Sequence, residues 1–591
     1  MTVGKFYLQL CLALATILLA TLLGITPALA ADNLISPGAW VLFSKEKDGA
    51  DYKQLSSTSF TVNVKKPSKD NYNIQVGHRI DQEMTEGQPL KVRFEGRASE
   101  SNMIVATVEK TTEPYTRALN EHVRLTPKWK AYDFTCFVPK YRSGDASLRF
   151  MVADHNGTIE LRAIDVELVS DTAFGGGINL LSDAQTNARI ERFRKGNLTV
   201  KVINQDNRPV ADALVHVQQT RHQFLFGCNA YELDLQDDSQ EQRTYRQEFS
   251  KLFNYATLPV YWGSFEPQQG HPNYKKLDEM AKWCDNHSIA TKGHPLVWHQ
   301  NFPSWAPTDP DQLLPILHQR VSDLITHYKG LISIWDVVNE ATAASNFKTP
   351  NGVSAWITRD GAPKVVETVL DWAREAAGEA HETFIYNDYQ TNSQTLEMLS
   401  SMQQDNKLPD VIGIQAHMHQ GNWPLLQLWT TCEEFAQFGR PLHFTETTVL
   451  SGPVRFIDWD HPPTDWLTTD DDEKKQAEYV TSYYKVLFSH PAVQAITWWD
   501  LSDKHAFVNA PAGLLRSDYS PKPAYHALYE LIHERWWSDL KTKSDKTGIA
   551  KSRAFYGDYK ITVTGPSGTS NTVTTALDSA QPDKTITVKV R

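Results

Sequence analysis

Cysteine is scarce in this sequence, with 5 among 591 residues. Past the N-terminal segment the cysteines stand far apart, with no CxxC pair and no neighbouring group of histidines. This spacing excludes a dense disulfide framework and offers no recognisable metal site; a single bridge is left open but is not predicted. The four positions are Cys136, Cys228, Cys284 and Cys432.

Basic residues do not gather into a stripe, and the formal net charge is -11. This charge balance argues against nucleic acid as a partner. Long apolar runs are missing after the first thirty residues, so no later segment is predicted to cross a bilayer. Aromatic residues, in contrast, are plentiful: 17 Trp and 22 Tyr offer flat faces suited to stacking on sugar rings, although a large hydrophobic core uses the same residues.

The first 30 residues have the pattern of a signal peptide. Lys5 supplies a positive start, Leu8 to Leu23 an apolar centre, and Pro27-Ala28-Leu29-Ala30 a small-residue cleavage site. Because the apolar run is long, an uncleaved anchor is the alternative. We predict a secreted or periplasmic protein that has no membrane contact after cleavage, and we expect a monomer.

The segment that follows has the pattern of a β-sandwich. Short alternating runs recur between turn residues, as in Phe60–Val64. Trp129–Tyr132, followed by Phe134 and Phe137, loosely resembles a strand of the jelly-roll carbohydrate-binding modules often found beside glycan hydrolases. A structural or dimerising sandwich without a sugar site is the alternative.

Changes of pattern along the chain predict its domains. Three consecutive glycines, Gly175 to Gly177, mark a linker. Asn197–Val202 and Ala213–Val217 are predicted to form a hairpin around Asn207–Pro209, and they belong to a small β-subdomain with strands at the C-terminus. The predicted parts are a signal peptide, 1–30; a β-sandwich, 31–170; a linker, 171–180; a flanking β-subdomain, 181–221 with 541–591; and a catalytic domain, 222–540.

In the segment 222–540, short apolar strands alternate with longer helical stretches, which is typical of parallel βα units. Eight units over this length predict a closed (β/α)₈ TIM barrel, flanked by the all-β sandwich and the small β-subdomain. The eight strands are predicted at 223–228, 256–261, 290–298, 332–339, 383–387, 411–417, 442–446 and 495–500. The predicted helices include 274–286, 313–328, 364–380 and 474–489.

Two of the predicted strands end in glutamate, at Glu340 after Ile332–Asn339 and at Glu446 in Leu442–Glu446. Catalytic groups of a parallel barrel lie at the carboxyl ends of its strands. Two carboxyl groups there suit glycosidic bond cleavage, because one protonates the leaving oxygen and the other attacks the anomeric carbon or activates water. The alternative for each glutamate alone is a helix cap or a solvent-facing side chain. This chemistry needs only carboxylates and water, so we expect no metal or organic cofactor.

Five motifs in order along the barrel resemble those of glycoside hydrolase family 10, the retaining endo-β-1,4-xylanases. They are Lys292–His299, Trp335–Glu340, Tyr386–Tyr389, Gly413–His417 and Phe444–Glu446, with further matches at Leu514–Leu515 and Pro521–Tyr525. The resemblance implies that Glu340 is the catalytic acid/base, that Glu446 is the nucleophile and that a polysaccharide is the substrate. It implies that the substrate-binding residues are His294, Trp298, Asn339, Tyr389, Gln415, His417 and Trp499.

This sequence departs from the family in the second barrel strand. The family has a Glu-Asn-x-Met-Lys-Trp run there that grips the glycone sugars, whereas this chain has Thr257-Leu258-Pro259-Val260-Tyr261-Trp262. Phe507 stands where a Trp is usual, and Thr448 where an Asp is usual. We predict a retaining endo-β-1,4-glycan hydrolase with xylan as the leading substrate. The alternatives are a retaining hydrolase of another β-glycan and a non-catalytic glycan-binding protein.

Overall fold

The computed structural model describes residues 33–35, 39–68, 70–169, 180–346, 350–458 and 461–591. The predicted signal peptide and the glycines of the predicted linker lie outside these residues, so both stay predictions. The chain divides into two compact units, Met1–Ile104 with Arg124–Ala173, and Val105–Val123 with Phe174–Arg591. Among the described helices, none combines the length and the apolar character needed to cross a membrane.

The N-terminal strands form two five-stranded sheets, as the alternating pattern predicts. Side chains such as Val62 and Leu161, which point from one of these sheets into the core, are buried. One sheet has the order β1 (Val41–Ser44), β4 (Ile74–Ile80), β9 (Ala146–Met151), β6 (Asn102–Lys110), β7 (Arg117–Leu125). The other has the order β2 (Ala50–Ser56), β3 (Ser59–Val64), β10 (Gly157–Leu168), β5 (Pro89–Ala98), β8 (Lys130–Phe137).

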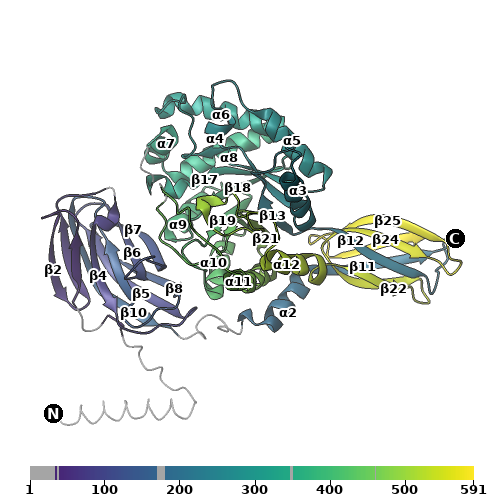
Figure 1. The fold of residues 1–591 in the computed structure, drawn as a ribbon, viewed down its shortest axis with the longest axis horizontal. Helices are drawn as coiled ribbons and strands as arrows, with labels where there is room; N and C mark the ends of the chain where they lie inside the picture. The colour runs from purple at the N-terminus through teal and green to yellow at the C-terminus, as the bar shows by residue number, and fades with distance from the viewer. Residues whose placement is uncertain (1–32, 36–38, 69, 170–179, 347–349, 459–460) are drawn as a thin grey trace, which may run out of the picture. The chain divides into compact units, whose positions relative to one another are not determined.

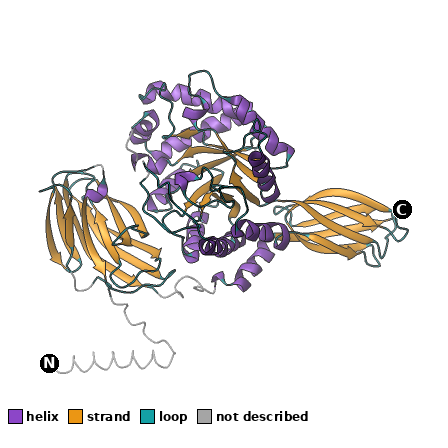
Figure 2. Cartoon of the chain, viewed as in Figure 1, coloured by secondary structure: helices purple, strands orange, loops and turns teal. Residues whose placement is uncertain are grey.

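The middle of the chain forms the predicted parallel barrel, with helices around the strands (Figures 1 and 2). The sheet closes because β15 pairs with β14 on one side and with β17 on the other. The strands are β13 (Leu225–Asn229), β14 (Tyr255–Pro259), β15 (Ala290–His294), β16 (Val297–Trp298), β17 (Ile334–Asn339), β18 (Thr383–Asp388), β19 (Val411–His417), β20 (Leu442–Thr448) and β21 (Val493–Trp498). The predicted strand 290–298 is split into β15 and β16, since Pro295 between them has no N–H to donate.

Helix boundaries follow the capping residues. Helix α6 begins at Pro310, before the predicted start, because Asp309 accepts a hydrogen bond from the Gln312 N–H at 3.1 Å. Helix α11 likewise begins at Asp470, where Thr469 is the cap. The helices of this unit are α2 (Asp183–Phe193), α3 (Gln240–Leu252), α4 (Trp262–Phe265), α5 (Tyr274–Asn286), α6 (Pro310–His327), α7 (Gly352–Asp360), α8 (Ala362–Ala377), α9 (Ser393–Gln404), α10 (Leu425–Ala436), α11 (Asp470–Ser489) and α12 (Pro523–Glu530).

The flanking strands form a second small sandwich, and the predicted hairpin is wrong. The turn forms, but its two strands enter different sheets because both bury apolar side chains, such as Val200 and Val217, in the same core. They therefore face each other across that core. The sheets are β23 (Ile549–Phe555), β11 (Lys195–Ile203), β26 (Asp583–Lys589), and β22 (Asp539–Lys543), β12 (Leu214–His222), β24 (Gly557–Thr564), β25 (Ser570–Leu577).

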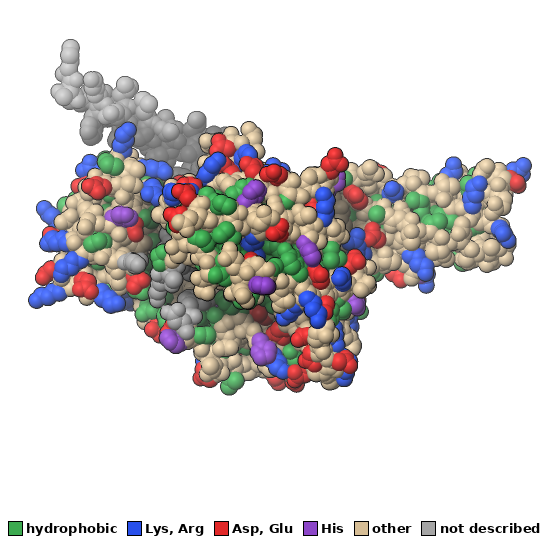
Figure 3. All heavy atoms as spheres, turned by 90° about the horizontal axis from the view of Figure 1, so that it is seen from above, with side chains coloured by type: hydrophobic (Ala, Val, Ile, Leu, Met, Phe, Trp, Pro, Cys, Tyr) green, Lys and Arg blue, Asp and Glu red, His purple; other side chains and the backbone are tan. Residues whose placement is uncertain are grey.

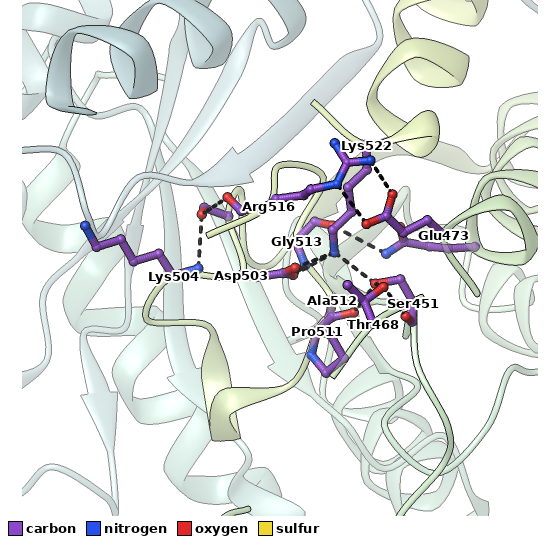
Figure 4. A network of polar contacts seen from close by, with 12 residues as sticks. Ser451, Thr468, Glu473, Asp503, Lys504, Pro511, Ala512, Gly513, Arg516 and Lys522 are labelled. Atoms are coloured by element: carbon purple, nitrogen blue, oxygen red, sulfur yellow. Dashed lines mark hydrogen bonds and ion pairs between the residues drawn. The ribbon is translucent and has the colours of Figure 1, made fainter. Parts of the chain in front are cut away.

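A buried ion pair ties together the loops that follow the last two barrel strands and the start of α12 (Figure 4). Lys522 Nζ donates to Asp503 Oδ1 at 2.7 Å and to Ser451 Oγ at 2.9 Å. Asp503 Oδ1 also accepts from the Gly513 N–H at 2.8 Å. The Lys522 side chain is completely buried, so this pair holds the loops without solvent screening.

Candidate active site

Glu340 and Glu446 lie at the carboxyl ends of two barrel strands, as predicted. Glu340 directly follows β17, and Glu446 lies near the end of β20. Glu340 has a φ of 58°, a left-handed backbone that residues other than glycine rarely adopt and that often marks a functional site. Both residues are buried: Glu340 is 7% exposed and Glu446 is 3% exposed.

A chain of side-chain amides joins the two carboxyl groups. Gln415 Nε2 donates to Glu340 Oε1 at 3.0 Å and to Asn339 Oδ1 at 3.2 Å. Asn387 Nδ2 donates to the same Asn339 oxygen at 2.9 Å and to Glu446 Oε1 at 2.7 Å. The two glutamates therefore belong to one continuous hydrogen-bonded site that β17, β18, β19 and β20 build together.

Glu446 is surrounded by groups that favour its ionised form. Burial would raise its pKa, but the hydrogen bond from His417 and the charges of His294, His417 and Lys292 outweigh it, and the pKa is lowered. His417 Nε2 lies 3.0 Å from Glu446 Oε2, and its Nδ1 lies 2.9 Å from Thr448 Oγ1. Thr448 thus orients the imidazole that contacts the carboxylate.

Glu340 is held in the opposite state. Burial raises its pKa to about 8, helped by the charges of Glu446 and Asp388, while hydrogen bonds from Gln415 and Trp298 work in the other direction. Trp298 Nε1 donates to Glu340 Oε2 at 3.2 Å. One carboxyl is therefore protonated near neutral pH and the other is ionised, which is the pairing that acid-assisted nucleophilic cleavage requires.

Three buried polar residues, Lys292, His294 and Asp336, lie next to Glu446. Asp336 Oδ2 contacts Lys292 Nζ at 2.7 Å and His294 Nδ1 at 2.6 Å. His294 Nε2 then lies 3.9 Å from Glu446 Oε1. Asp336 holds the Nδ1 atom of His294, and this contact orients the Nε2 atom of the same ring toward Glu446.

The remaining predicted residues are aromatic. The Trp499 ring lies 5.8 Å from His294 and 5.5 Å from His417, between centroids. Tyr389 directly follows β18 at the same end of the barrel, and its side chain is 38% exposed. Phe507, at the position where the family has a Trp, lies 5.6 Å from His417. The strand ends thus bring the predicted aromatic and polar residues to one face of the barrel.

Sequence reasoning missed four residues of this site. Lys292, Asp336 and Asn387 stand in the motifs that point to the family, but their part in the site depends on contacts between strands. Tyr261 was noted only as a departure, yet its ring lies 5.5 Å from His294 and 5.4 Å from Trp298. The spacing of carboxylates, amides and histidines at strand ends was the signal that could have found the first three.

The described residues contain no group of three or more His, Cys, Asp or Glu side chains arranged to hold a metal ion. The four cysteines at 136, 228, 284 and 432 are buried and unbridged. On the face shown in Figure 3, acidic and basic side chains are interspersed, and neither sign gathers in one region of that view.

Comparisons with known proteins agree on one family. The model of glycosyl hydrolase family 10 matches residues 216–531. Endo-1,4-beta-xylanase B of Thermotoga neapolitana is 28% identical over 311 residues, which are 49% of this chain and 84% of that protein. Endo-1,4-beta-xylanase A of Caldicellulosiruptor sp. is 29% identical over 297 residues, covering 45% of this chain and 40% of that protein.

Two further similarities concern a curated relative and a solved structure. Anti-sigma-I factor RsgI6 of Acetivibrio thermocellus is 25% identical over 394 residues, 65% of this chain and 46% of that protein. The crystal structure of xylanase 10B from Thermotoga petrophila in complex with xylobiose is 25% identical, with a TM-score of 0.44, and covers 53% of this chain and 95% of that one. The family match spans the whole barrel with both strand-end glutamates. The chain therefore belongs to glycosyl hydrolase family 10 and is a xylanase-like glycoside hydrolase.

Proposed function

We propose that this protein cleaves β-1,4-linked glycan chains internally by a retaining double displacement, with xylan as the leading candidate substrate. Glu446 attacks the anomeric carbon while Glu340 protonates the leaving oxygen, and Glu340 then acts as base toward the water that releases the sugar. The observation that carries the proposal is the pair of opposite pKa shifts on two carboxyl groups joined by one amide network.

The neighbouring residues have roles that fit this reaction. Asn339, held by Asn387 and Gln415, is the candidate for the contact with the sugar 2-hydroxyl, which can strengthen in the transition state. His417 keeps Glu446 ionised and oriented. The names of the relatives support xylan, and the altered strand β14 favours a second candidate substrate, another β-glycan.

Product analysis tests this proposal. The full chain is incubated with xylan, mixed-linkage glucan and a soluble cellulose derivative, and the released sugars are followed by chromatography and by proton NMR. Internal cleavage of xylan with initial release of the β-anomer is the expected result. Release of the α-anomer would contradict the retaining mechanism, and cleavage of only a different glycan would replace the substrate.

The opposite protonation states predict a broad pH profile. Glu340 must be protonated in the free enzyme, so kcat/KM should fall as pH rises through about 8, the pKa of that group. Glu446 must be ionised, and its lowered pKa moves the acidic limb below the usual glutamate range. Initial rates with a xylo-oligosaccharide, whose leaving group needs a proton, from pH 3 to pH 10 measure both limbs. An alkaline limb centred near pH 5 would contradict the raised pKa of Glu340.

Removing the indole donor should shift only the alkaline limb. In Trp298→Phe the ring remains but Glu340 loses a hydrogen bond that favours its charged form, so the pKa of Glu340 rises. The alkaline limb should therefore move to higher pH, while the acidic limb, which reports Glu446, stays in place. Equal movement of both limbs would contradict this assignment.

A further inference from the structure

Five rings lie in contact at the barrel face beside the two carboxyl groups. This aromatic arc consists of Trp298, Tyr261, Tyr231, Trp499 and His294. Centroid distances are 5.4 Å from Trp298 to Tyr261, 5.6 Å from Tyr261 to Tyr231 and 5.4 Å from Tyr231 to Trp499. His294 contacts Tyr261 at 5.5 Å and Trp499 at 5.8 Å.

Tyr231 completes the aromatic arc from a different strand. It follows β13, which lies between β14 and β21 in the sheet, and its ring bridges Tyr261 after β14 and Trp499 after β21. The two contacts of Tyr231 are edge-on, at interplanar angles of 82° and 77°. The orientation of Tyr261 is thus held on one side by Trp298 and on the other by Tyr231.

The two tyrosine hydroxyls lie near the reacting groups and are neutral. Burial raises the pKa of Tyr261, and the charges of Glu446 and Glu340 raise it further. Burial also raises the pKa of Tyr231, with contributions from Tyr261 and Glu446. The Tyr231 hydroxyl is buried and interacts with the Tyr261 hydroxyl, an interaction that raises the pKa of Tyr231 and works against the rise at Tyr261.

Strand β14 offers the site little else. Thr257 and Leu258, where the family resemblance places a carboxylate and an amide, are both completely buried. The Lys292 ammonium is also completely buried and paired with Asp336. Contacts from this side therefore come from ring faces and phenol hydroxyls rather than from ionic groups.

We propose that Tyr261, positioned by Tyr231, determines specificity for the glycone sugar next to the cleaved bond. This sugar is recognised by stacking and by a phenol hydrogen bond, and a second glycone sugar adds little. The inference rests on the proposed hydrolysis of β-glycans. It identifies the substrate class as β-glycan chains that are bound on the glycone side mainly through one uncharged sugar.

Two aryl substrates test how many glycone sugars contribute to recognition. We compare kcat/KM for nitrophenyl β-xyloside and nitrophenyl β-xylobioside with the full chain. The bioside is expected to exceed the monoside by less than about tenfold, which corresponds to less than 1.4 kcal/mol. A preference above about tenfold would overturn the inference while leaving the hydrolase assignment intact. A wild-type protein that cleaves neither aryl substrate and does not cleave xylan would contradict the proposed function itself.

Variants then separate the roles of the two tyrosines. Tyr261→Phe keeps the ring and should lower kcat/KM about 3- to 10-fold on both substrates, with both pH limbs unmoved. Tyr231→Phe should have a smaller effect, and the double variant should lose no more than Tyr261→Phe alone, because Tyr231 acts through Tyr261. Full additivity, or no loss in Tyr261→Phe, would overturn the assignment.

A matched control removes a buried hydroxyl away from the site. The Tyr525 hydroxyl donates to the Glu248 carbonyl at 3.1 Å, between α12 and α3. Tyr525→Phe should leave kcat/KM on both substrates unchanged. A loss equal to that of Tyr261→Phe would show that the effect is general to buried tyrosines and would overturn the inference.

Discussion

Replacing Glu446 with alanine is expected to lower kcat for xylan at least about 10⁴-fold, because the proposed mechanism assigns the covalent bond to its carboxylate. Glu446 is 3% exposed, and its carboxylate is hydrogen-bonded by Asn387 and His417. Steady-state rates on xylan and on an aryl β-xyloside measure the loss. Activity within tenfold of wild type would reject Glu446 as nucleophile.

The space left by the lost carboxylate gives a second readout. Formate added to Glu446→Ala is a small anion that can take the place of the nucleophile, and it should restore part of the turnover with the activated aryl substrate. Glu340→Gln should behave differently, losing about 10²- to 10⁴-fold on xylan but much less on an aryl substrate whose leaving group needs no proton. Glu530→Gln, an exposed glutamate on α12 paired with Arg535, is the control and should keep wild-type rates.

Lys522→Met is expected to reduce the free energy of unfolding by about 3–5 kcal/mol, because it leaves a buried carboxylate without its partner. The lysine side chain is completely buried and Asp503 is 11% exposed (Figure 4). Burial already lowers the pKa of Lys522 and raises that of Asp503, and each partner offsets part of that cost. Denaturant unfolding of the full chain, followed by tryptophan fluorescence, measures the change.

The loss should depend on pH in a defined direction. Without Lys522 the folded pKa of Asp503 lies further above its unfolded value, so the carboxylate opposes folding at every pH above that unfolded value. The deficit should therefore shrink as pH falls toward 4. Lys504→Met is the matched control, since Lys504 pairs with Glu241 at a partly exposed site and should cost about 1 kcal/mol or less. Equal losses in the two variants would contradict the role of burial.

Much of the barrel could be predicted because its signals are local. Helix α5 occupies the predicted residues, and the glutamates stand where apolar strands end, since period and composition reflect the burial of each strand. The pattern of apolar residues did not predict the break at Pro295 or the early starts of α6 and α11. These features depend on single residues, namely a proline without an N–H and the capping residues before each helix. The wrong hairpin has a different cause: a turn specifies that the chain reverses, but not which sheet each strand joins.

The sequence by itself determined the family, the parallel barrel and the position of the two glutamates at strand ends, because strand ends and motifs consist of consecutive residues. Tertiary structure alone decided the rest of the site. Asn387 joins Asn339 to Glu446 only because β17, β18 and β20 lie in order in the sheet. Tyr231 meets Tyr261 and Trp499 for the same reason, although the three are far apart in sequence. Closing the sheet converts distant residues into neighbours, and pKa shifts arise only from such neighbours and from burial.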